Sequence, residues 1–247
     1  MSRTAITYIG GPTAILEYAG LRLLTDPTFD PPQTYDDPDG TPLVKTTGPG
    51  IPLHQIGAID LVLLSHHEHE DNLDLSGAAT LAMAATVLST PEAANDLDGV
   101  HGLAAWQSHR VGEVTITAVP ALHGPPGCED YMGTVTGFVL QAAGEPTVYV
   151  SGDNASLDLV REIAARFPAI DIAILFAGAA RVPGIDGALT LTSADAAQAA
   201  RILGARQVVG LHTEDWEHFS ETRAQLEAAF APSGILVATP RGVRVEL

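Results

Sequence analysis

Short apolar runs dominate the first part of the chain. Residues 5–9, 14–18 and 21–25 are rich in Ile, Leu, Thr and Tyr, a pattern that predicts β-strands. Ala19-Gly20 separates the last two runs and suits a tight hairpin turn. Residues 27–52 then lose all periodicity and contain seven prolines and three glycines, which predicts a long irregular loop. Loops of this length inside a domain tend to be functional.

Strand-like and helix-like patterns are mixed along the rest of the chain. The predicted strands are residues 60–64, 86–89, 114–119, 135–140, 147–151, 171–176, 207–211, 235–238 and 243–246. The predicted helices are residues 74–85, 91–97, 156–167, 193–203 and 220–230. Thr90 and Pro91 supply an N-cap and a first helical residue. Strands first, then mixed strands and helices, favour layers of β-sheet covered by helices.

The composition fits one folded domain. The chain has 247 residues, of which 46% are hydrophobic, enough for a real core. Because no Pro/Gly/Ser-rich linker or charge run divides it, we expect a single domain over residues 1–247. The N-terminus lacks the apolar region of a signal peptide, and the longest weakly polar stretch, residues 77–88, is too short to span a bilayer. The lone cysteine, Cys128, cannot form an internal disulfide, so we expect a cytoplasmic protein without a membrane partner.

The strong negative charge bears on the kind of partner. The formal net charge is -18, and Lys45 is the single lysine among 12 basic residues. Such a field repels a phosphate backbone unless a basic groove overrides it, and the sequence contains no basic cluster. We therefore expect a small-molecule substrate and no nucleic acid. A homo-oligomer is compatible with the sequence.

Histidines gather just past the ends of predicted strands. Of nine histidines, five are placed this way, and Asp153 is placed similarly; the histidines are His66, His67, His69, His123 and His212. In an extended segment alternate side chains point the same way, which would put His67, His69 and Asp71 on one face. Two imidazoles and a carboxylate begin a site for Zn, Mn or Fe, and His123, Asp153 and His212 are candidates to complete it.

Each of these residues has an ordinary interpretation when taken alone. A histidine after a strand is usually a surface or capping residue, and Gly152-Asp153-Asn154 is a common turn or helix cap. The metal hypothesis therefore depends on the whole set, in this order and at the strand ends.

A family resemblance supports the same hypothesis. Residues 65–74, Ser-His-His-Glu-His-Glu-Asp-Asn-Leu-Asp, resemble the His-x-His-x-Asp-His signature of the metallo-β-lactamase superfamily. Residues 8–13 and 24–27 are similar to the branch that contains the ascorbate-6-phosphate lactonases. Residues 120–124, 150–153 and 210–212 match later motifs in the family order, followed by Trp216 and His218. The resemblance implies an α/β fold, the four-layer αββα sandwich, with metals at one edge between the two sheets.

The resemblance also implies a set of metal ligands. His67, His69 and His123 would hold a first divalent ion, Asp71 and His212 a second, and Asp153 would bridge both. Zinc comes first among the candidate ions, with manganese or iron as alternatives. The signature ends in histidine where this chain has Asn72, so the second site would be weak and oxygen-rich, or empty. A shift of one residue would make His66 the inward ligand instead of His67.

The implied activity is hydrolysis of a small ester, lactone or amide by a metal-activated hydroxide. Asp71 would orient the hydroxide, His218 is a candidate catalytic proton donor, and Arg181 is a candidate to bind an anionic substrate group. An arginine after a strand is as often a plain surface residue. Phosphodiester hydrolysis is the second hypothesis. A third is a metal-binding protein without catalysis, which only Asn72 favours.

Overall fold

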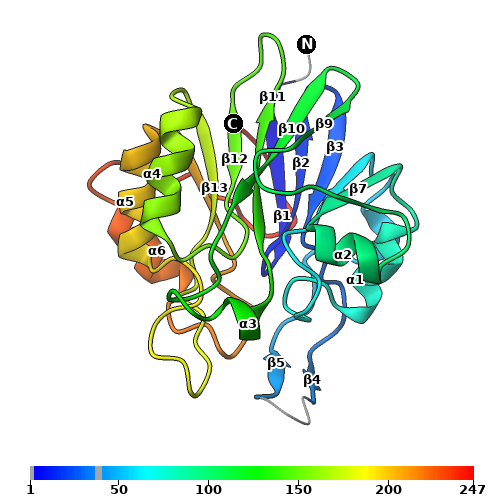
Figure 1. Ribbon diagram of the computed structural model, residues 1–247, viewed down its shortest axis with the longest axis vertical. Coiled ribbons are helices and arrows are strands. Elements are labelled where there is room, and N and C mark those ends of the chain that lie inside the picture. The colour runs from blue at the N-terminus through cyan, green and yellow to red at the C-terminus, as the bar shows by residue number, and fades with distance from the viewer. Residues whose placement is uncertain (1–2, 37–40) are drawn as a thin grey trace.

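Two β-sheets lie face to face in the middle of the molecule (Figure 1). The computed structural model describes residues 3–36 and 41–247. The strands are β1 (Ala5–Gly10), β2 (Thr13–Tyr18), β3 (Leu21–Thr25), β4 (Gln33–Tyr35), β5 (Leu43–Lys45), β6 (Leu61–Leu63), β7 (Thr86–Ser89), β8 (Val100–Gly102), β9 (Ser108–Val111), β10 (Val114–Pro120), β11 (Thr136–Gln141), β12 (Val148–Val150), β13 (Ile172–Phe176), β14 (Gln207–Leu211) and β15 (Arg244–Glu246). One sheet has the order β15-β1-β2-β3-β6-β7-β8, the other the order β14-β13-β12-β11-β10-β9.

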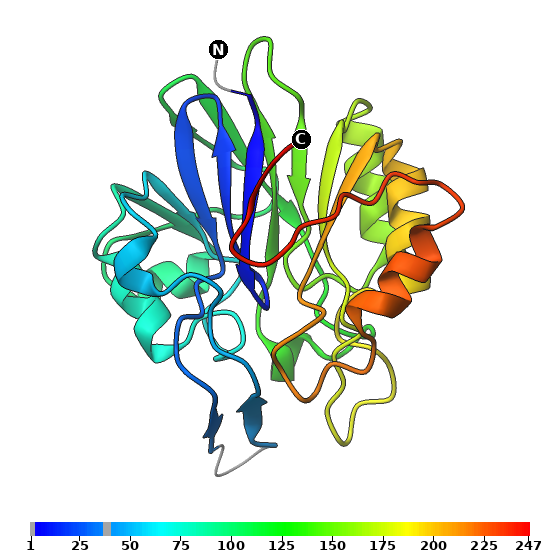
Figure 2. The same cartoon turned by 180° about the vertical axis from the view of Figure 1, so that it is seen from behind.

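Helices cover the outer face of each sheet. They are α1 (Leu75–Leu81), α2 (Pro91–Asp96), α3 (Glu129–Met132), α4 (Leu157–Arg166), α5 (Ser193–Leu203) and α6 (Arg223–Phe230), with a 3₁₀ turn η1 (Leu53–Gln55). α1 and α2 lie on the seven-stranded sheet, and α4, α5 and α6 lie on the six-stranded sheet (Figures 1 and 2). The predicted four-layer αββα sandwich is confirmed. Within the described ranges, no helix combines the length and apolar character needed to cross a membrane.

Period-two alternation places each strand between two apolar layers. In β6, Leu61 and Leu63 pack in the core between the sheets, while Val62 faces the helical layer of α1 and α2. In β13, Ile174 packs between the sheets and Leu175 faces α4, α5 and α6. Strands buried on both faces read as continuous apolar runs, which is why these segments were recognisable in the sequence.

Side-chain caps set where most of the helices begin. The N-caps with a side-chain hydrogen bond are Asp74, Thr90, Ser156, Thr192 and Thr222. The predicted cap at Thr90 is confirmed, since its side chain accepts from the Ala93 amide. Each such cap contributes about 1 kcal/mol by satisfying an amide that the helix leaves free.

Some predicted elements differ from the structure. The helix expected over residues 74–85 ends at Leu81, with Ala82 as its C-cap. Residues 235–238 form no strand and make only an isolated bridge between Val208 and Leu236. β8, β9 and α3 were not predicted from the sequence, and the predicted irregular loop contains the β4–β5 hairpin. Residues 1–2 of the expected domain and 37–40 of this loop lie outside the described residues.

A buried carboxylate fixes the loop over residues 27–52 beside α1. Asp74 accepts hydrogen bonds from Lys45 Nζ (2.8 Å) and from the amides of Phe29 (2.9 Å) and Asp30 (2.7 Å). Lys45 and Asp74 are both buried and form an ion pair. The Lys45 ammonium also lies 5.4 Å from the centre of the Trp216 ring. The single lysine of the chain therefore ties the β4–β5 hairpin to the segment that follows β14.

Candidate metal centre

Loops from both sheets meet at one end of the sandwich. On the seven-stranded side, the segment after β6 carries His66, His69 and Asp71. On the six-stranded side, His123 follows β10 and Asp153 follows β12, and His212 directly follows β14. The predicted convergence of distant strand ends is therefore what the structure shows. The residues form two adjacent groups, each with ligand atoms within 4.8 Å of one another.

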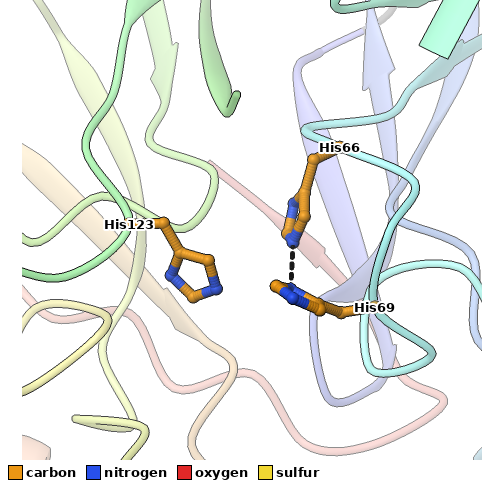
Figure 3. A group of neighbouring side chains, drawn as sticks. All are labelled: His66, His69 and His123. Carbon is orange, nitrogen blue, oxygen red and sulfur yellow. Dashed lines mark hydrogen bonds between the residues drawn. The ribbon is translucent and has the colours of Figure 1, made fainter. Parts of the chain in front are cut away.

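The first group, the histidine triad, consists of His66, His69 and His123 (Figure 3). Nε2 of His66 lies 2.9 Å from Nδ1 of His69. The ring of His123 lies 5.3 Å from that of His66 and 5.2 Å from that of His69. Three imidazoles that point at one another from two sheets present nitrogen donors to a common centre.

Burial favours the neutral form of two triad members, His66 and His123. Burial, together with the neighbouring imidazoles, lowers the pKa of His66 well below its usual value. Burial lowers the pKa of His123 to about 3. His123 Nδ1 donates to the Leu189 carbonyl (2.9 Å), which leaves Nε2 as the acceptor. Ser65 Oγ lies 2.9 Å from His66 Nδ1 and orients that ring in a similar way.

His67 does not join the triad, which corrects the expected alternation. Its Nε2 lies 2.9 Å from Asp96 Oδ2, and its Nδ1 lies 3.2 Å from Glu68 Oε2. The segment after β6 consists of bends and turns, so the extended-strand rule does not apply to it. His66 and His69, three residues apart, converge instead. The one-residue shift considered from the sequence is the arrangement in the structure.

The second group, the carboxylate group, consists of Asp71, Asp153 and His212. Nε2 of His212 lies 3.2 Å from Asp71 Oδ2, and its Nδ1 lies 3.7 Å from Asp153 Oδ1. His218 Nε2 lies 3.0 Å from the same Asp71 oxygen. A distance of 3.6 Å between His123 Nε2 and Asp153 Oδ2 joins this group to the triad. Asp153 thus stands between the two groups.

Arg181 belongs to neither the histidine triad nor the carboxylate group. It lines a cavity of about 480 Å³ between the loop after β13 and the first turns of α4 and α5. Arg161 lines the same cavity, as do Leu122 and Gly124, the neighbours of His123. Arg161 is paired with Asp158, whereas Arg181 has no ion pair within residues 3–36 and 41–247. The backbone amide of Arg181 donates to the His218 carbonyl (3.0 Å).

Comparison with known proteins places the chain in a family. Residues 21–213 match the Beta-lactamase superfamily domain. The chain belongs to the metallo-β-lactamase superfamily. A UPF0173 metal-dependent hydrolase of Pelotomaculum thermopropionicum is 30% identical over 200 residues, which cover 77% of this chain and 80% of that protein.

Solved structures of other proteins share this fold. A possible metal-dependent hydrolase from Veillonella parvula superposes with a TM-score of 0.84 at 18% identity and covers 100% of both chains. An isothiocyanate hydrolase from Delia radicum gut bacteria gives a TM-score of 0.83 at 22% identity and covers 98% of both chains. The family match and the Pelotomaculum thermopropionicum relative show that the chain is a metal-dependent hydrolase of the metallo-β-lactamase fold.

The superfamily signature places a histidine where this chain has Asn72. Asn72 is fully buried, and its Nδ2 lies 3.3 Å from Ser65 Oγ and 3.4 Å from Asp153 Oδ1. Its Oδ1 is buried without a hydrogen-bond partner in the described part of the chain. The residue therefore lies at the carboxylate group, as its place in the signature implies, but it presents an amide there.

Asp26, at the end of β3, is a member of the site that sequence reasoning missed. It is buried, and its Oδ1 accepts from the Ser65 amide (2.7 Å), which fixes the start of the segment that carries His66. Burial, partly offset by hydrogen bonds from Ser65 and Asn72, raises the pKa of Asp26 to about 7. The available signal is a carboxylate between a strand end and Pro27, in the segment 24–27 that also carries part of the family resemblance.

The donor atoms of the carboxylate group fit a cation. Burial and the negative charge of Asp71 raise the pKa of Asp153 well above its usual value. Burial also acts to raise the pKa of Asp71, but His212 and His218 outweigh it and hold that pKa well below its usual value. Asp153 Oδ2 and both ring nitrogens of His212 are buried without a hydrogen bond among the described residues. Buried polar atoms without partners cost free energy, and a bound divalent ion would satisfy them.

Proposed function

We propose that this hydrolase cleaves a small ester, lactone or amide, with the histidine triad and the carboxylate group as its metal ligands. The observation that carries the proposal is the contact between the two groups, where Asp153 Oδ2 lies 3.6 Å from His123 Nε2. One or two divalent ions would be held, with zinc first and manganese or iron next. Such an ion supplies a Lewis acid and lowers the pKa of water towards about 7.

The chain's own residues would position the water and move its proton. Asp71 Oδ2 faces both His212 and His218, and these neighbours keep the carboxylate ionised. In this proposal Asp71 accepts a hydrogen bond from the attacking water, orients it, takes up the proton that the water loses on attack, and passes that proton to His218. His218 Nε2, 3.0 Å from Asp71, then donates a proton to the leaving group. The resemblance of residues 8–13 and 24–27 to the ascorbate-6-phosphate lactonases supports a lactone as substrate.

A substrate panel on metal-loaded enzyme tests this activity. A lactone, 4-nitrophenyl acetate, an aryl isothiocyanate and bis-(4-nitrophenyl) phosphate would be compared at equal concentration. We expect turnover of the lactone or the carboxylic ester. Turnover of the phosphodiester alone would support the phosphodiesterase hypothesis instead. No turnover at full metal occupancy would support a metal-binding protein without catalysis.

Arg181 is the residue we propose for an anionic group of the substrate, because its guanidinium lines a cavity beside the His123 segment and has no ion pair among the described residues. Arg181→Gln should raise KM for a substrate with a carboxylate or phosphate by about 10-fold, the equivalent of one charge-assisted hydrogen bond. The kcat should change little. Steady-state kinetics on a neutral ester serve as the control and should be unaffected; an equal loss on both substrates would rule out a role in charge recognition.

A further inference from the structure

The two halves of the metal centre offer different donor atoms. The histidine triad presents only imidazole nitrogens. The carboxylate group presents carboxylate oxygens from Asp71 and Asp153 and a single imidazole from His212. Imidazole suits zinc, whereas carboxylate and carbonyl oxygens suit harder ions such as Mn²⁺ and Mg²⁺.

Asn72 adds to the oxygen character of the carboxylate group. Its side chain is fully buried, with Nδ2 3.4 Å from Asp153 Oδ1 and with Oδ1 lacking a hydrogen-bond partner within the described residues. A half-turn of the carboxamide exchanges these two atoms. It would then direct Oδ1 toward the space beside Asp153, where a histidine would have offered nitrogen.

Negative charge is also concentrated on this half. Asp26, Asp71 and Asp153 are all buried, and no lysine or arginine in the described ranges forms an ion pair with any of them. The rings of His212 and His218 lie beside Asp71, and the rings of His123 and His212 lie beside Asp153. Several buried carboxylates with few counter-charges favour a divalent ion with strong affinity for oxygen.

We propose that Asn72 makes the centre selective for two different metals, with a zinc-type ion in the histidine triad and a harder ion such as Mn²⁺ in the carboxylate group. This inference rests on the ligand assignment proposed above. It predicts that zinc alone fills one position tightly and the second only weakly. Zinc and manganese together fill both.

Metal binding to the chelator-stripped full chain tests the inference without an activity assay. Equilibrium dialysis against Zn²⁺, against Mn²⁺ and against both would be read by elemental analysis, with Mn²⁺ electron paramagnetic resonance as the spectroscopic signal. We expect one tight zinc per chain from zinc alone, and one ion of each kind from the mixture. Two zinc ions of comparable affinity in the unmodified protein would overturn the proposal.

Variants at residue 72 separate the donor atom from the fold. Asn72→His should tighten the second zinc by at least about 10-fold, the size of effect seen even for outer-shell partners of metal ligands. Asn72→Asp, which keeps an oxygen donor, should retain manganese in the second position. His67→Asn is the matched control, because His67 lies in the same segment but outside the triad, and it should leave both affinities unchanged. Melting temperatures establish that each variant is folded.

The outcomes distinguish this inference from the ligand assignment beneath it. If neither ion binds stoichiometrically to the unmodified chain, the proposed centre itself is wrong. If ions bind but Asn72→His and Asn72→Asp leave zinc and manganese affinities unchanged, the centre stands and the role of Asn72 is refuted.

Discussion

Burial favours the neutral form of His66 and His123, and neutral imidazole is the form that binds metal. His66 and His123 are both buried, and burial is the largest cause that lowers their pKa values. A ring that stays unprotonated in mildly acidic solution keeps its lone pair available, so burial prepares the site for a cation. The same burial carries a stability cost in the metal-free chain, because protons then favour the unfolded state.

The unfolding free energy of the metal-free chain should decrease as the pH is lowered, and His123 should contribute to this decrease. Burial lowers the pKa of His123 from its ordinary value of 6.5 to about 3 in the folded chain, so the unfolded chain binds this proton first as pH falls. The stability that the neutral His123 ring contributes therefore begins to decrease as pH falls below about 6.5, and it goes on decreasing until pH reaches about 3. In His123→Gln, which cannot titrate, the deficit in unfolding free energy relative to the unmodified chain should shrink by about 1.4 kcal/mol per pH unit in that window.

Urea unfolding in the presence of a chelator, at several pH values, measures this difference. Asp26 has a raised pKa and acts in the opposite direction, but it is present in both proteins and cancels in the comparison. A difference that stays constant with pH would show that His123 is not buried as a neutral ring.

Residue identities at the site were more predictable than their register. Five of the six grouped residues were recognised because histidines and aspartates recur at strand ends, and those ends meet at one edge. The choice between His66 and His67 depends on how a short turn-rich segment bends, and no periodicity encodes that. Asp26 was missed because a single carboxylate before a proline is also an ordinary way to end a strand.

Among the secondary-structure elements, β14 places its histidine under close backbone constraint. His212 directly follows β14 with φ of 58°, in the left-handed region that few residues with side chains adopt. Its amide donates to the Gly11 carbonyl (2.7 Å), and its own carbonyl lies against Gly178. Strain of this kind persists only where the surroundings enforce it, which is common at functional sites.

Gly178→Ala should disturb the site through the backbone of β14. A Cβ at residue 178 would lie 2.1 Å from the His212 carbonyl oxygen, which cannot rotate away. We expect a loss of roughly 1–3 kcal/mol in unfolding free energy, as for other overpacked positions, together with weaker metal binding. Urea unfolding and metal titration measure both.

Gly48→Ala is the matched control, because a Cβ there meets only Pro32 Cδ at 3.7 Å and Pro31 Cα at 3.9 Å, both ordinary van der Waals distances. It should behave like the unmodified chain. If the two alanine variants are indistinguishable, Gly178 does not position His212.

Buried strands and capped helices were predictable, and short exposed strands were not. The buried runs of β6 and β13 stand out because both faces are apolar, and the capped helices begin at recognisable residues such as Thr90 and Thr192. β8 and β9 lie at sheet edges, are only three and four residues long and are partly exposed, so their pairing comes from neighbours rather than from pattern.

At the scale of the whole molecule, the site joins the two halves of the sandwich. The triad takes His66 and His69 from the segment after β6 and His123 from the segment after β10, which belong to different sheets. An ion bound there would link both layers and offset the buried carboxylates. The single-domain organisation over residues 1–247 and the cytoplasmic location stay predictions.

Metal should therefore raise the melting temperature of the entire fold. Free metal at 100 times its Kd stabilises the folded state by about 2.7 kcal/mol, which for a chain of this size corresponds to roughly 5–10 °C. Differential scanning calorimetry before and after chelation measures the shift. Asp153→Ala should lose most of it, because Asp153 contacts both groups. If metal raises the melting temperature of Asp153→Ala as much as that of the unmodified chain, metal stabilises the protein by binding at another site.

Anomalous diffraction from crystals grown with zinc tests the central claim most directly, because it locates the ion without assuming its ligands. We predict a peak about 2.0–2.1 Å from one ring nitrogen of each member of the histidine triad, the usual zinc–imidazole distance. A peak held by His67 in place of His66, or the absence of any peak between the two sheets, would contradict it.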